Sequence, residues 1–365
     1  MAARRSNTKL AEDERFMDRA IAEARKGLGR TAPNPAVGAV LVRGGKVVAV
    51  GHHARAGSPH AEIVALRKAG ARARGATLYS TLEPCAHQGR TPPCSDAILA
   101  AGVRRVVFAS DDPNPLVNGK GVHQLKRAKV AVLGGVRRAE ADRLNRAWFH
   151  HLAHGTPYVT LKVASTADGK LATTSGDSRW ITSPAARAVV HRVRDEVDAV
   201  LVGAGTVNAD DPQLTARFPG ARSPLRVVLD GKLSTPTTAK VYKPGHLIFA
   251  GVRPSPGETR QVERLPSRRG EVSLLQVLRR LGKRGVVHLL VEGGAEVLTQ
   301  FVEQDLWDEL LLFVAPKLAG PTGRPWFTGH SVEKMRDALP LGALSVEAVG
   351  PDALLRIERH SERAL

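Results

Sequence analysis

Residues 76–110 read ATLYSTLEPCAHQGRTPPCSDAILAAGVRRVVFAS, and the architecture expected for the N-terminal half follows from this segment. It begins with a strand-like run, ATLYST, and continues through a loop that carries both cysteines of the chain. A helix-like run, SDAILAAG, and a second strand-like run, RRVVFAS, come next. Strands that alternate with helices predict an α/β fold.

On the N-terminal side of this segment, residues 1–12 are small, polar and charged, and they predict a flexible tail. An amphipathic helix is expected from Asp13 to Gly27, where apolar residues recur at helical spacing: Phe16, Ala20, Ile21 and Ala24. The sequence then predicts a Pro-rich loop, a strand, a hairpin turn at Gly44-Gly45, a second strand and a helix over Ala61–Ala69.

On the C-terminal side, a helical stretch ends near Trp148, and a new strand, YVTLKVAS, begins at Tyr158. The turn residues between them, Trp148–Pro157, predict a linker and a domain boundary near residue 150. Strand and helix signals alternate again in the second half, so two α/β domains are expected. The length of 365 residues also favours two domains over one.

Composition excludes several classes of protein. The chain is 42% hydrophobic and 24% charged, unlike a disordered or coiled-coil protein. It has no uninterrupted apolar run of ~18 residues and no apolar core near its N-terminus, so neither a membrane span nor a secretory signal is expected. We therefore expect a cytoplasmic protein. Two cysteines in that reducing compartment favour metal ligands or inert core residues over a disulfide.

The positive charge is unevenly distributed. Net charge is +19, and residues 1–150 hold 26 Lys and Arg against 12 Asp and Glu. Such a balance suits a polyanionic partner or a small phosphorylated substrate, and charge alone does not choose between them. A nucleic-acid deaminase is thus one alternative. Aromatic residues, which stack on single-stranded bases, make up only 4% of the chain and disfavour it.

Four residues of the first half have the types and order of a catalytic zinc site: His60, Glu62, Cys85 and Cys94. One imidazole and two thiolates fill three of the four tetrahedral positions of zinc and leave one for water, whose pKa zinc lowers towards ~7. Zinc deaminases carry H-x-E followed by P-C-x-x-C, with the Glu as proton carrier. Here eight residues separate the cysteines, so the second half of that pattern is stretched.

Two other interpretations of these four residues stay open at this point. The cysteines could be structural core residues beside an incidental His and a surface Glu. The second interpretation is a closed structural zinc site, for which His87 is the one candidate for a fourth ligand at ordinary spacing.

In the second half, VVHLLVEGGAEVLTQF predicts a buried strand that passes through Gly293-Gly294 into a helix. Backbone N–H groups at such a turn can bind a phosphate, although a tight turn without a ligand has the same pattern. Residues 203–208, GAGTVN, fail the dinucleotide fingerprint because Asn208 replaces its last glycine. Asp210-Asp211-Pro212 offers paired carboxylates or an ordinary turn.

At the level of family, RKGLGRTAPNPAVGAVLV, the HAE triplet and TLEPCAHQGRTPPC closely resemble the deaminase domain of the bifunctional riboflavin-biosynthesis deaminase/reductase. The resemblance covers nearly all of residues 13–150. It implies a cytidine-deaminase-like three-layer domain that hydrolytically removes the 2-amino group of 2,5-diamino-6-ribosylamino-4(3H)-pyrimidinone 5′-phosphate. The long loop between the cysteines belongs to the site in that family.

Three later segments resemble the reductase domain of the same family, a dihydrofolate-reductase-like α/β fold: LKVASTADGKLATTSGDSRWITSPAAR, DAVLVGAGTVNADDPQLTAR and LLVEGGAEVL with FVAPKLAG. We assign this domain to residues 155–365. The resemblance implies NADPH-dependent reduction of the ribosyl group of 5-amino-6-(5-phosphoribosylamino)uracil to ribityl.

Position by position, the resemblance assigns site residues in both halves. In the deaminase it implies Zn²⁺ ligands at His60, Cys85 and Cys94, a proton carrier at Glu62, and substrate contacts at Asn34, His53, His87 and Arg90. In the reductase it implies NADPH contacts at Ala164, Trp180, Thr206, Asp210, Gly294, Ala295, Glu296, Val297, Leu298 and Thr299. It also implies reductase substrate contacts at Lys162, Ser178, Arg194, Leu214, Arg217 and Glu292.

The sequence therefore predicts a cytoplasmic bifunctional enzyme with two small phosphorylated pyrimidine substrates. We expect no nucleic-acid or membrane partner, and we expect a homo-oligomer. A paralogue that acts on another pyrimidine or a flavin-like metabolite is the nearer alternative, because it would keep the same fold.

Overall fold

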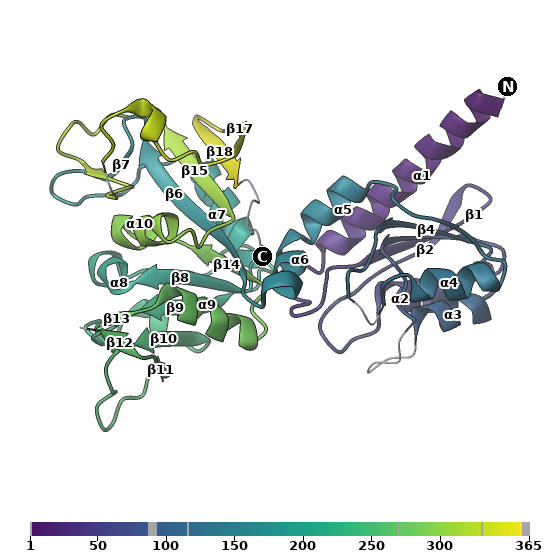
Figure 1. The fold of residues 1–365 in the computed structure, drawn as a ribbon, viewed down its shortest axis with the longest axis horizontal. Helices are drawn as coiled ribbons and strands as arrows, with labels where there is room; N and C mark the ends of the chain where they lie inside the picture. Colours follow the sequence, from purple (N-terminus) through teal and green to yellow (C-terminus); the bar gives the residue numbers. More distant parts are fainter. Residues whose placement is uncertain (1, 87–92, 115–116, 269, 330, 360–365) are drawn as a thin grey trace. The chain divides into compact units, whose positions relative to one another are not determined.

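The computed structural model describes residues 2–86, 93–114, 117–268, 270–329 and 331–359, and the chain divides into two compact units (Figure 1). Unit 1 is Met1–His154 and unit 2 is Gly155–Leu365. The break between them lies at Gly155, where a helix ends and a Pro-led strand begins.

Unit 1 is built on a five-stranded sheet with the order β2-β1-β3-β4-β5. The strands are β1 (Gly38–Arg43), β2 (Lys46–His52), β3 (Thr77–Leu82), β4 (Arg105–Ser110) and β5 (Ala131–Leu133). Strand β1 pairs antiparallel with β2 and β3, and the β3-β4-β5 pairs are parallel. The predicted hairpin turn at Gly44-Gly45 joins β1 to β2, and both glycines have positive φ, as a two-residue hairpin turn requires.

Helices cover both faces of this sheet and make three layers (Figure 1). One face carries α1 (Ala2–Arg25) and α5 (Arg138–Leu144), whose apolar residues share a core cluster with β1, β3 and β4. The opposite face carries α2 (Ala61–Ala69), α3 (Cys94–Ala100) and α4 (Lys120–Arg127). A short turn, η1 (Gly70–Ala73), follows α2, and α6 (Arg146–His154) ends the unit.

Two sequence-based expectations about unit 1 are corrected. The flexible tail expected at residues 1–12 is wrong as to secondary structure, because α1 begins at Ala2. Ala2–Arg25 contains no Gly or Pro and many good helix formers, so the helix extends beyond its buried face. The linker expected over residues 148–157 is also helical as far as His154, since Trp148 is a buried residue of α6.

Unit 2 is built on a nine-stranded sheet with the order β11-β10-β9-β8-β14-β6-β15-β18-β17. In chain order these strands are β6 (Tyr158–Thr166), β8 (Ala199–Gly203), β9 (Leu225–Leu229), β10 (His246–Ala250), β11 (Val262–Arg264), β14 (His288–Val291), β15 (Glu309–Ala315), β17 (Ala343–Val349) and β18 (Asp352–Glu358). All pairs from β11 to β15 are parallel, and β18 and β17 add an antiparallel edge.

Both faces of the parallel part are buried. Along β8, Ala199 and Leu201 enter a core cluster with α9 (Leu274–Lys283) and α10 (Ala295–Glu303), whereas Val200 and Val202 enter a second cluster on the other face. Such continuous apolar strands are typical of parallel sheets that are covered on both sides. Helix α7 (Pro184–Glu196) packs on β15 and β18 through a third cluster.

Short elements complete unit 2. They are α8 (Ala204–Asp210), η2 (Lys240–Tyr242), η3 (Met335–Asp337) and two small ribbons, in which β7 (Lys170–Ala172) pairs with β16 (Arg324–Pro325) and β12 (Ser267–Arg268) pairs with β13 (Glu271–Val272). Among the described residues, none of the helices combines the length and the apolar character that crossing a bilayer requires.

Candidate active sites

In unit 1, the starts of two helices bring together three metal-ligand side chains. His60 is the residue that precedes α2, and Cys94 is the first residue of α3. Cys85 lies in the loop after β3, which connects to α3 through residues outside the described part. A proline lies just before each helix, Pro59 or Pro93, and its fixed φ angle favours a sharp entry.

The three ligand atoms lie at distances that suit zinc. His60 Nδ1 is 3.2 Å from Cys94 Sγ and 3.6 Å from Cys85 Sγ, and all three atoms lie within 4.8 Å of one another. A tetrahedral zinc site with ordinary bond lengths places N and S ligands about 3.6 Å apart. Both sulfur atoms are buried. Hydrogen bonds from Cys94 and His60 lower the pKa of Cys85, whereas the hydrogen bond with Cys85 and burial raise the pKa of Cys94.

The carboxyl group of Glu62 lies beside these ligands. Glu62 is the second residue of α2, and only 3% of it is exposed. Burial, followed by the nearby Cys85, raises the pKa of Glu62 to about 6. A carboxyl group in this state exchanges protons readily near neutral pH, which is the property that a general acid and base needs.

Two of the four predicted substrate contacts of unit 1 are described, and they form one hydrogen-bonded chain. His53 Nδ1 lies 3.2 Å from the Pro59 carbonyl, and His53 Nε2 lies 3.1 Å from Asn34 Nδ2. Burial lowers the pKa of His53, so the neutral ring donates to Pro59 and accepts from the Asn34 amide. The buried His53 therefore orients Asn34. His87 and Arg90 lie outside the described residues.

Close backbone contacts at two glycines hold the site together. A Cβ at Gly51 in β2 would lie 2.4 Å from the Ala61 carbonyl oxygen, so Gly51 allows α2 to approach the sheet. A Cβ at Gly121 in α4 would lie 1.9 Å from the Pro84 carbonyl oxygen, directly before Cys85. The sequence analysis missed both positions, because a glycine inside a strand or helix gives no local sign of what approaches it.

In unit 2, a large cleft lies at the carboxyl ends of the parallel strands. It is lined by all of the predicted reductase residues except Leu298 and Thr299: Lys162, Ala164, Ser178, Trp180, Arg194, Thr206, Asp210, Leu214, Arg217, Glu292, Gly294, Ala295, Glu296 and Val297. These residues come from six separate segments of sequence. Ligands of open α/β sheets bind at this edge, where the strands end and the helices begin.

Leu298 and Thr299 are turned away from the cleft. Leu298 is fully buried in the core cluster below α10. The Thr299 hydroxyl accepts a hydrogen bond from the Thr328 backbone N–H at 2.9 Å. Because a helix turns 100° per residue, α10 cannot present six successive residues to one cleft, and the assignment of these two to the cofactor has no support in the geometry.

A buried ion pair lies deep in the cleft. Arg194 binds Glu292 in a bidentate manner, with Nε–Oε1 at 2.5 Å and Nη2–Oε2 at 2.9 Å, and Lys162 Nζ lies 3.6 Å from Oε2. Burial alone would raise the pKa of Glu292, but Arg194 and Lys162 outweigh it and lower the pKa to about 2. Glu292 is therefore a carboxylate at neutral pH, and one positive charge of the trio remains uncompensated.

The turn from β14 into α10 presents backbone to the cleft. Gly294 is the residue before α10, and its N–H donates to Thr206 Oγ1 of α8 at 3.0 Å. A Cβ at Gly293 would lie 2.7 Å from Val297 Cβ, so the turn is tight enough to require glycine there. Asp211, in contrast, forms an ion pair with Lys240, with Nζ at 2.9 Å from its carboxylate.

Arg187 and Lys240 are among the cationic residues of the cleft that the sequence analysis missed. Arg187 stacks on the exposed indole of Trp180, with its guanidinium carbon 4.4 Å from the ring centroid. Lys240 reaches the cleft from the loop after β9. Both looked like ordinary surface charges in sequence, since their partners lie seven and 29 residues away.

Comparisons with known proteins relate each unit to a known family. A family model described as the RibD C-terminal domain matches residues 157–355, and one described as the cytidine and deoxycytidylate deaminase zinc-binding region matches residues 10–110. Riboflavin biosynthesis protein RibD of Aquifex aeolicus is 43% identical over 95% of this chain and 99% of its own length. The RibD protein of Escherichia coli is 40% identical, with the same two coverages.

Solved structures resemble the whole chain. RibD of Acinetobacter baumannii has a TM-score of 0.87 at 40% identity, over 96% of this chain and 99% of that chain. The Thermotoga maritima protein described as a diaminohydroxyphosphoribosylaminopyrimidine deaminase/5-amino-6-(5-phosphoribosylamino)uracil reductase has a TM-score of 0.87 at 38% identity, with the same coverages.

Fold and sites define a two-domain enzyme, in which a cytidine-deaminase-like zinc domain precedes a dihydrofolate-reductase-like domain that uses NADPH. The chain belongs to the RibD family of bifunctional riboflavin-biosynthesis enzymes. This membership confirms the family resemblance and the two cofactors, Zn²⁺ and NADPH, that the sequence predicts. The alternatives of a nucleic-acid deaminase and of a paralogue with another substrate are not favoured.

Proposed function

We propose that unit 1 converts 2,5-diamino-6-ribosylamino-4(3H)-pyrimidinone 5′-phosphate to its deaminated form, and that unit 2 then reduces the ribosyl group to ribityl. The observation that supports this most directly is the cluster of His60, Cys85 and Cys94 with the buried Glu62 beside it. The deaminase domain is assigned to residues 13–150 and the reductase domain to residues 155–365.

In the deaminase, His60, Cys85 and Cys94 would hold the zinc. When bound, zinc lowers the pKa of water and so supplies a nucleophile at neutral pH. Glu62 takes a proton from the attacking water and delivers it to the departing amino group, which leaves as ammonia. Asn34, oriented by His53, contacts the pyrimidine, while His87 and Arg90 complete the substrate site, with Arg90 at the phosphate.

In the reductase, NADPH would lie against Ala164, Trp180, Thr206, Asp210 and the N-terminal end of α10, and it supplies hydride to the first carbon of the ribosyl group. Ser178, Leu214, Glu292 and Lys162 surround the substrate. Arg217 is exposed at the cleft and suits the substrate phosphate. Arg194 donates hydrogen bonds from Nε and Nη2 to Glu292 and from Nη1 to the Thr215 carbonyl. The remaining N–H groups of its guanidinium are left for the phosphate.

Incubation of the enzyme with its first substrate tests the order of the two reactions. Zinc-loaded protein with the diamino-pyrimidinone phosphate alone should release ammonia and stop at the deaminated product. Addition of NADPH should convert that product to the ribityl compound, observed by mass spectrometry and by loss of NADPH absorbance. Conversion of neither compound by well-folded, zinc-loaded protein would refute the proposal. We place these reactions in the cytoplasm, where thiols remain reduced.

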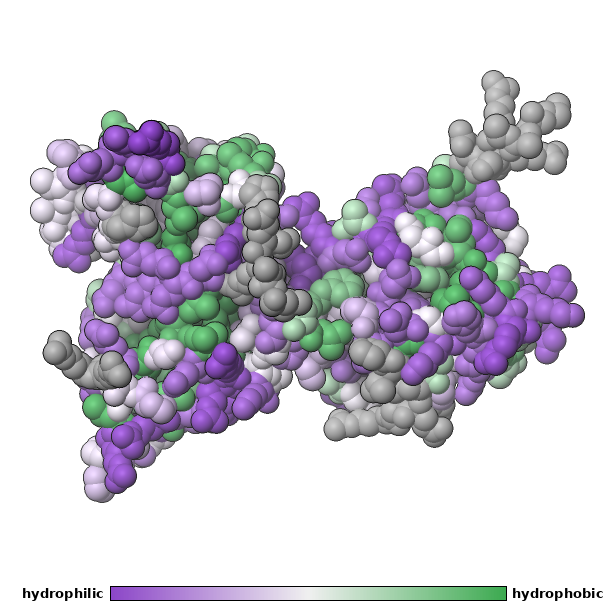
Figure 2. Space-filling model, in the orientation of Figure 1, coloured by the Kyte–Doolittle hydropathy of each residue, from purple (hydrophilic) through white to green (hydrophobic). Residues whose placement is uncertain are grey.

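We also propose a homo-oligomer that pairs the outer strand β17 with the same strand of a second copy. Residues 343–348 of β17 are all exposed, Leu344 and Val346 included, and Figure 2 shows hydrophobic residues gathered in this region. An exposed apolar edge strand offers unpaired backbone groups, and an antiparallel copy of it is self-complementary. Light scattering should give a multiple of the 39.0 kDa chain mass, and Val346→Lys should yield monomers.

A further inference from the structure

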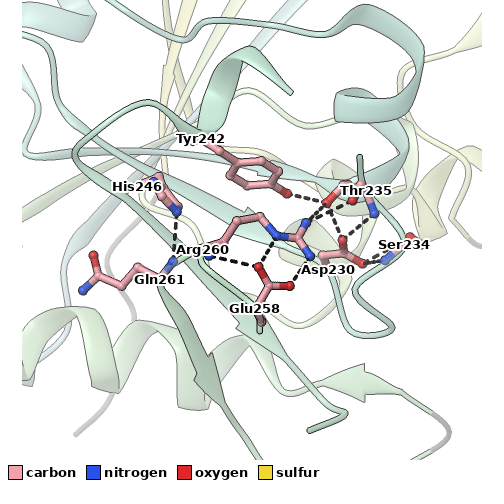
Figure 3. A network of polar contacts seen from close by, with 8 residues as sticks. All are labelled: Asp230, Ser234, Thr235, Tyr242, His246, Glu258, Arg260 and Gln261. Carbon is pink, nitrogen blue, oxygen red and sulfur yellow. Dashed lines mark hydrogen bonds and ion pairs between the residues drawn. The ribbon is translucent and has the colours of Figure 1, made fainter. Parts of the chain in front are cut away.

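A buried polar network lies outside the cleft, in the two loops that follow β9 and β10 (Figure 3). Asp230 directly follows β9 and is 1% exposed. Its carboxylate accepts four hydrogen bonds, from the backbone N–H and the hydroxyl of both Ser234 and Thr235, at 2.6–3.1 Å. These bonds close the loop after β9 upon itself.

Arg260 connects the second loop to the first. Its guanidinium binds Glu258 in a bidentate manner, with Nε–Oε1 at 2.8 Å and Nη2–Oε2 at 2.6 Å. Its Nη1 donates to the carbonyl and the hydroxyl oxygen of Thr235, at 3.0 and 3.1 Å. Figure 3 shows Arg260 enclosed between Glu258, Thr235 and Tyr242, whose ring lies 5.0 Å from the guanidinium carbon.

This network is one residue away from the wall of the cleft. Asp230, Glu258 and Arg260 do not line the cleft, but Gly231 does, together with Ser267 and Gly270. The Gly231 carbonyl accepts the N–H groups of Gly251 and Val252, at 2.9 and 3.2 Å. The cleft wall is thus attached at Gly231 to one loop and at Gly251 to the other.

Backbone atoms approach one another closely at the wall itself. A Cβ at Gly231 would lie 1.7 Å from the Gly270 carbonyl oxygen, and the Ser267 hydroxyl donates to the Gly251 carbonyl at 3.0 Å. Glycine backbones meet there in close contact, and the loop after β9 also packs on apolar residues through Leu233 and Val241. The polar network adds to this packing by fixing the loop on which Gly231 lies.

We propose that the network of Asp230, Thr235, Glu258 and Arg260 positions the Gly231 wall of the reductase cleft and thereby sets the affinity for NADPH. These are positioning residues, because they act through the backbone of Gly231 and Gly251. The inference rests on the proposed binding of NADPH in this cleft. Weakening of the network lowers the fraction of molecules whose wall is in the binding position, and the apparent Kd rises by the inverse of that fraction.

Two variants test the network in the full-length enzyme. Arg260→Lys keeps the charge but loses the bidentate geometry, and Thr235→Val removes only the hydroxyl group at the centre of the network. We expect each to raise the KM and Kd for NADPH about tenfold, while kcat at saturating NADPH, the KM for the pyrimidine and the deaminase activity stay within about twofold. Amide exchange at Gly251 and Val252 should accelerate, and exchange in β14 should not.

The matched control is Arg284→Lys. Arg284, the residue after α9, binds Glu263 of β11 in the same unit. It lies outside the cleft, and its substitution should leave the KM for NADPH unchanged. Unchanged NADPH affinity in folded Arg260→Lys and Thr235→Val would overturn the inference. If Arg260→Lys does not fold, as shown by loss of its thermal transition, the NADPH affinity of Thr235→Val tests the inference by itself.

A third variant separates this inference from the proposed function. Gly294→Val adds a side chain to the cleft in front of α10, where a Cβ meets no atom closer than 3.5 Å. If NADPH binds in the cleft, Gly294→Val should weaken NADPH binding. If only Gly294→Val loses affinity for NADPH, the proposed role of the network is rejected. If Arg260→Lys, Thr235→Val and Gly294→Val all bind NADPH with full affinity, the cleft is rejected as the NADPH site.

Discussion

At the scale of single residues, two buried carboxyl groups have opposite environments. Glu62 lies beside the thiols of Cys85 and Cys94, and burial raises its pKa to about 6 although His60 opposes this shift. Burial also acts on Glu292, but Arg194 and Lys162 more than offset it and lower the pKa to about 2. The same residue type is thus suited to carry protons in one unit and to remain a fixed negative charge in the other.

We expect Glu62→Gln to stop deamination and leave the rest of the enzyme intact. The amide has nearly the same shape but cannot accept and return a proton, so kcat for ammonia release should fall by roughly 100- to 10,000-fold. Zinc content and NADPH-dependent reduction should remain near those of the unaltered enzyme. Elemental analysis and both activity assays check this, and near-normal ammonia release would exclude Glu62 as the proton carrier.

The ion pair of Glu292 predicts a pH dependence of stability. Its pKa is lower in the folded protein than the value of about 4.5 expected when unfolded, so the pair stabilises the fold above that pH and loses its effect as pH falls towards 2. Thermal unfolding should therefore show a drop over this range that is smaller in Glu292→Gln. At neutral pH the variant should lose roughly 3–5 kcal/mol, because Arg194 stays buried without its partner.

Glu263→Gln serves as the comparison for that experiment. Glu263 pairs with Arg280 and Arg284 at the surface, and such exposed pairs contribute about 0–1 kcal/mol. An equal acid-dependent drop in the unaltered protein and in Glu292→Gln would mean that the buried pair does not contribute to it.

At the scale of elements, the zinc ligands depend on how closely helices approach the sheet of unit 1. Helix α2 reaches β2 at Gly51, and α4 reaches the Pro84-Cys85 segment at Gly121. In both places the opposing atom is a backbone carbonyl oxygen, which cannot rotate away as a side chain can. The ligand positions are therefore set by helix packing as well as by the ligand residues themselves.

We expect Gly121→Ala to weaken zinc binding. Alanine favours a helix by about 1 kcal/mol over glycine, but its Cβ would lie 1.9 Å from the Pro84 carbonyl oxygen and must displace Cys85. Competition with a chelator should show at least tenfold weaker zinc affinity, with reductase activity unchanged. Lys126→Ala, at an exposed position of the same helix, should match the unaltered protein. Equal affinities in the two variants would contradict this account.

At the scale of the whole molecule, the chain carries two separate cores and two sites of different chemistry. The metal-ligand cluster lies in unit 1, and the cleft is lined by residues of unit 2 alone. Each unit has its own sheet and its own apolar clusters. Each activity should therefore survive loss of the other.

Removal of the metal tests this independence. A chelator that strips zinc should abolish ammonia release and leave NADPH oxidation with the deaminated substrate within about twofold of its starting rate. Added Zn²⁺ should restore the first activity. Parallel loss of both activities, with the protein still folded, would show that the sites are coupled.

Division of the chain at the unit boundary gives a second test. A fragment of residues 155–365 should fold and reduce the deaminated substrate, and a fragment of residues 1–154 should bind zinc and deaminate. Circular dichroism and the two assays measure this outcome. A folded C-terminal fragment without reductase activity would indicate that unit 1 contributes to that site.

Much of this protein is readable in its sequence because the deciding interactions are local or periodic. The helix starting at Ala61, the hairpin at Gly44-Gly45 and the alternating strands follow from residue spacing. The order of His, Glu and two Cys indicates zinc chemistry because few other uses need those residue types together. Family resemblance extends this to the cleft residues of unit 2.

Other features depend on residues that are distant in sequence and became visible only in three dimensions. Arg194 and Glu292 are 98 residues apart, and Gly121 lies 37 residues beyond Pro84. Helix phase turns Leu298 and Thr299 away from the cleft, although the motif that contains them faces it. Spacing along a chain specifies which element a residue joins, whereas burial, charge pairing and close contact depend on how those elements pack.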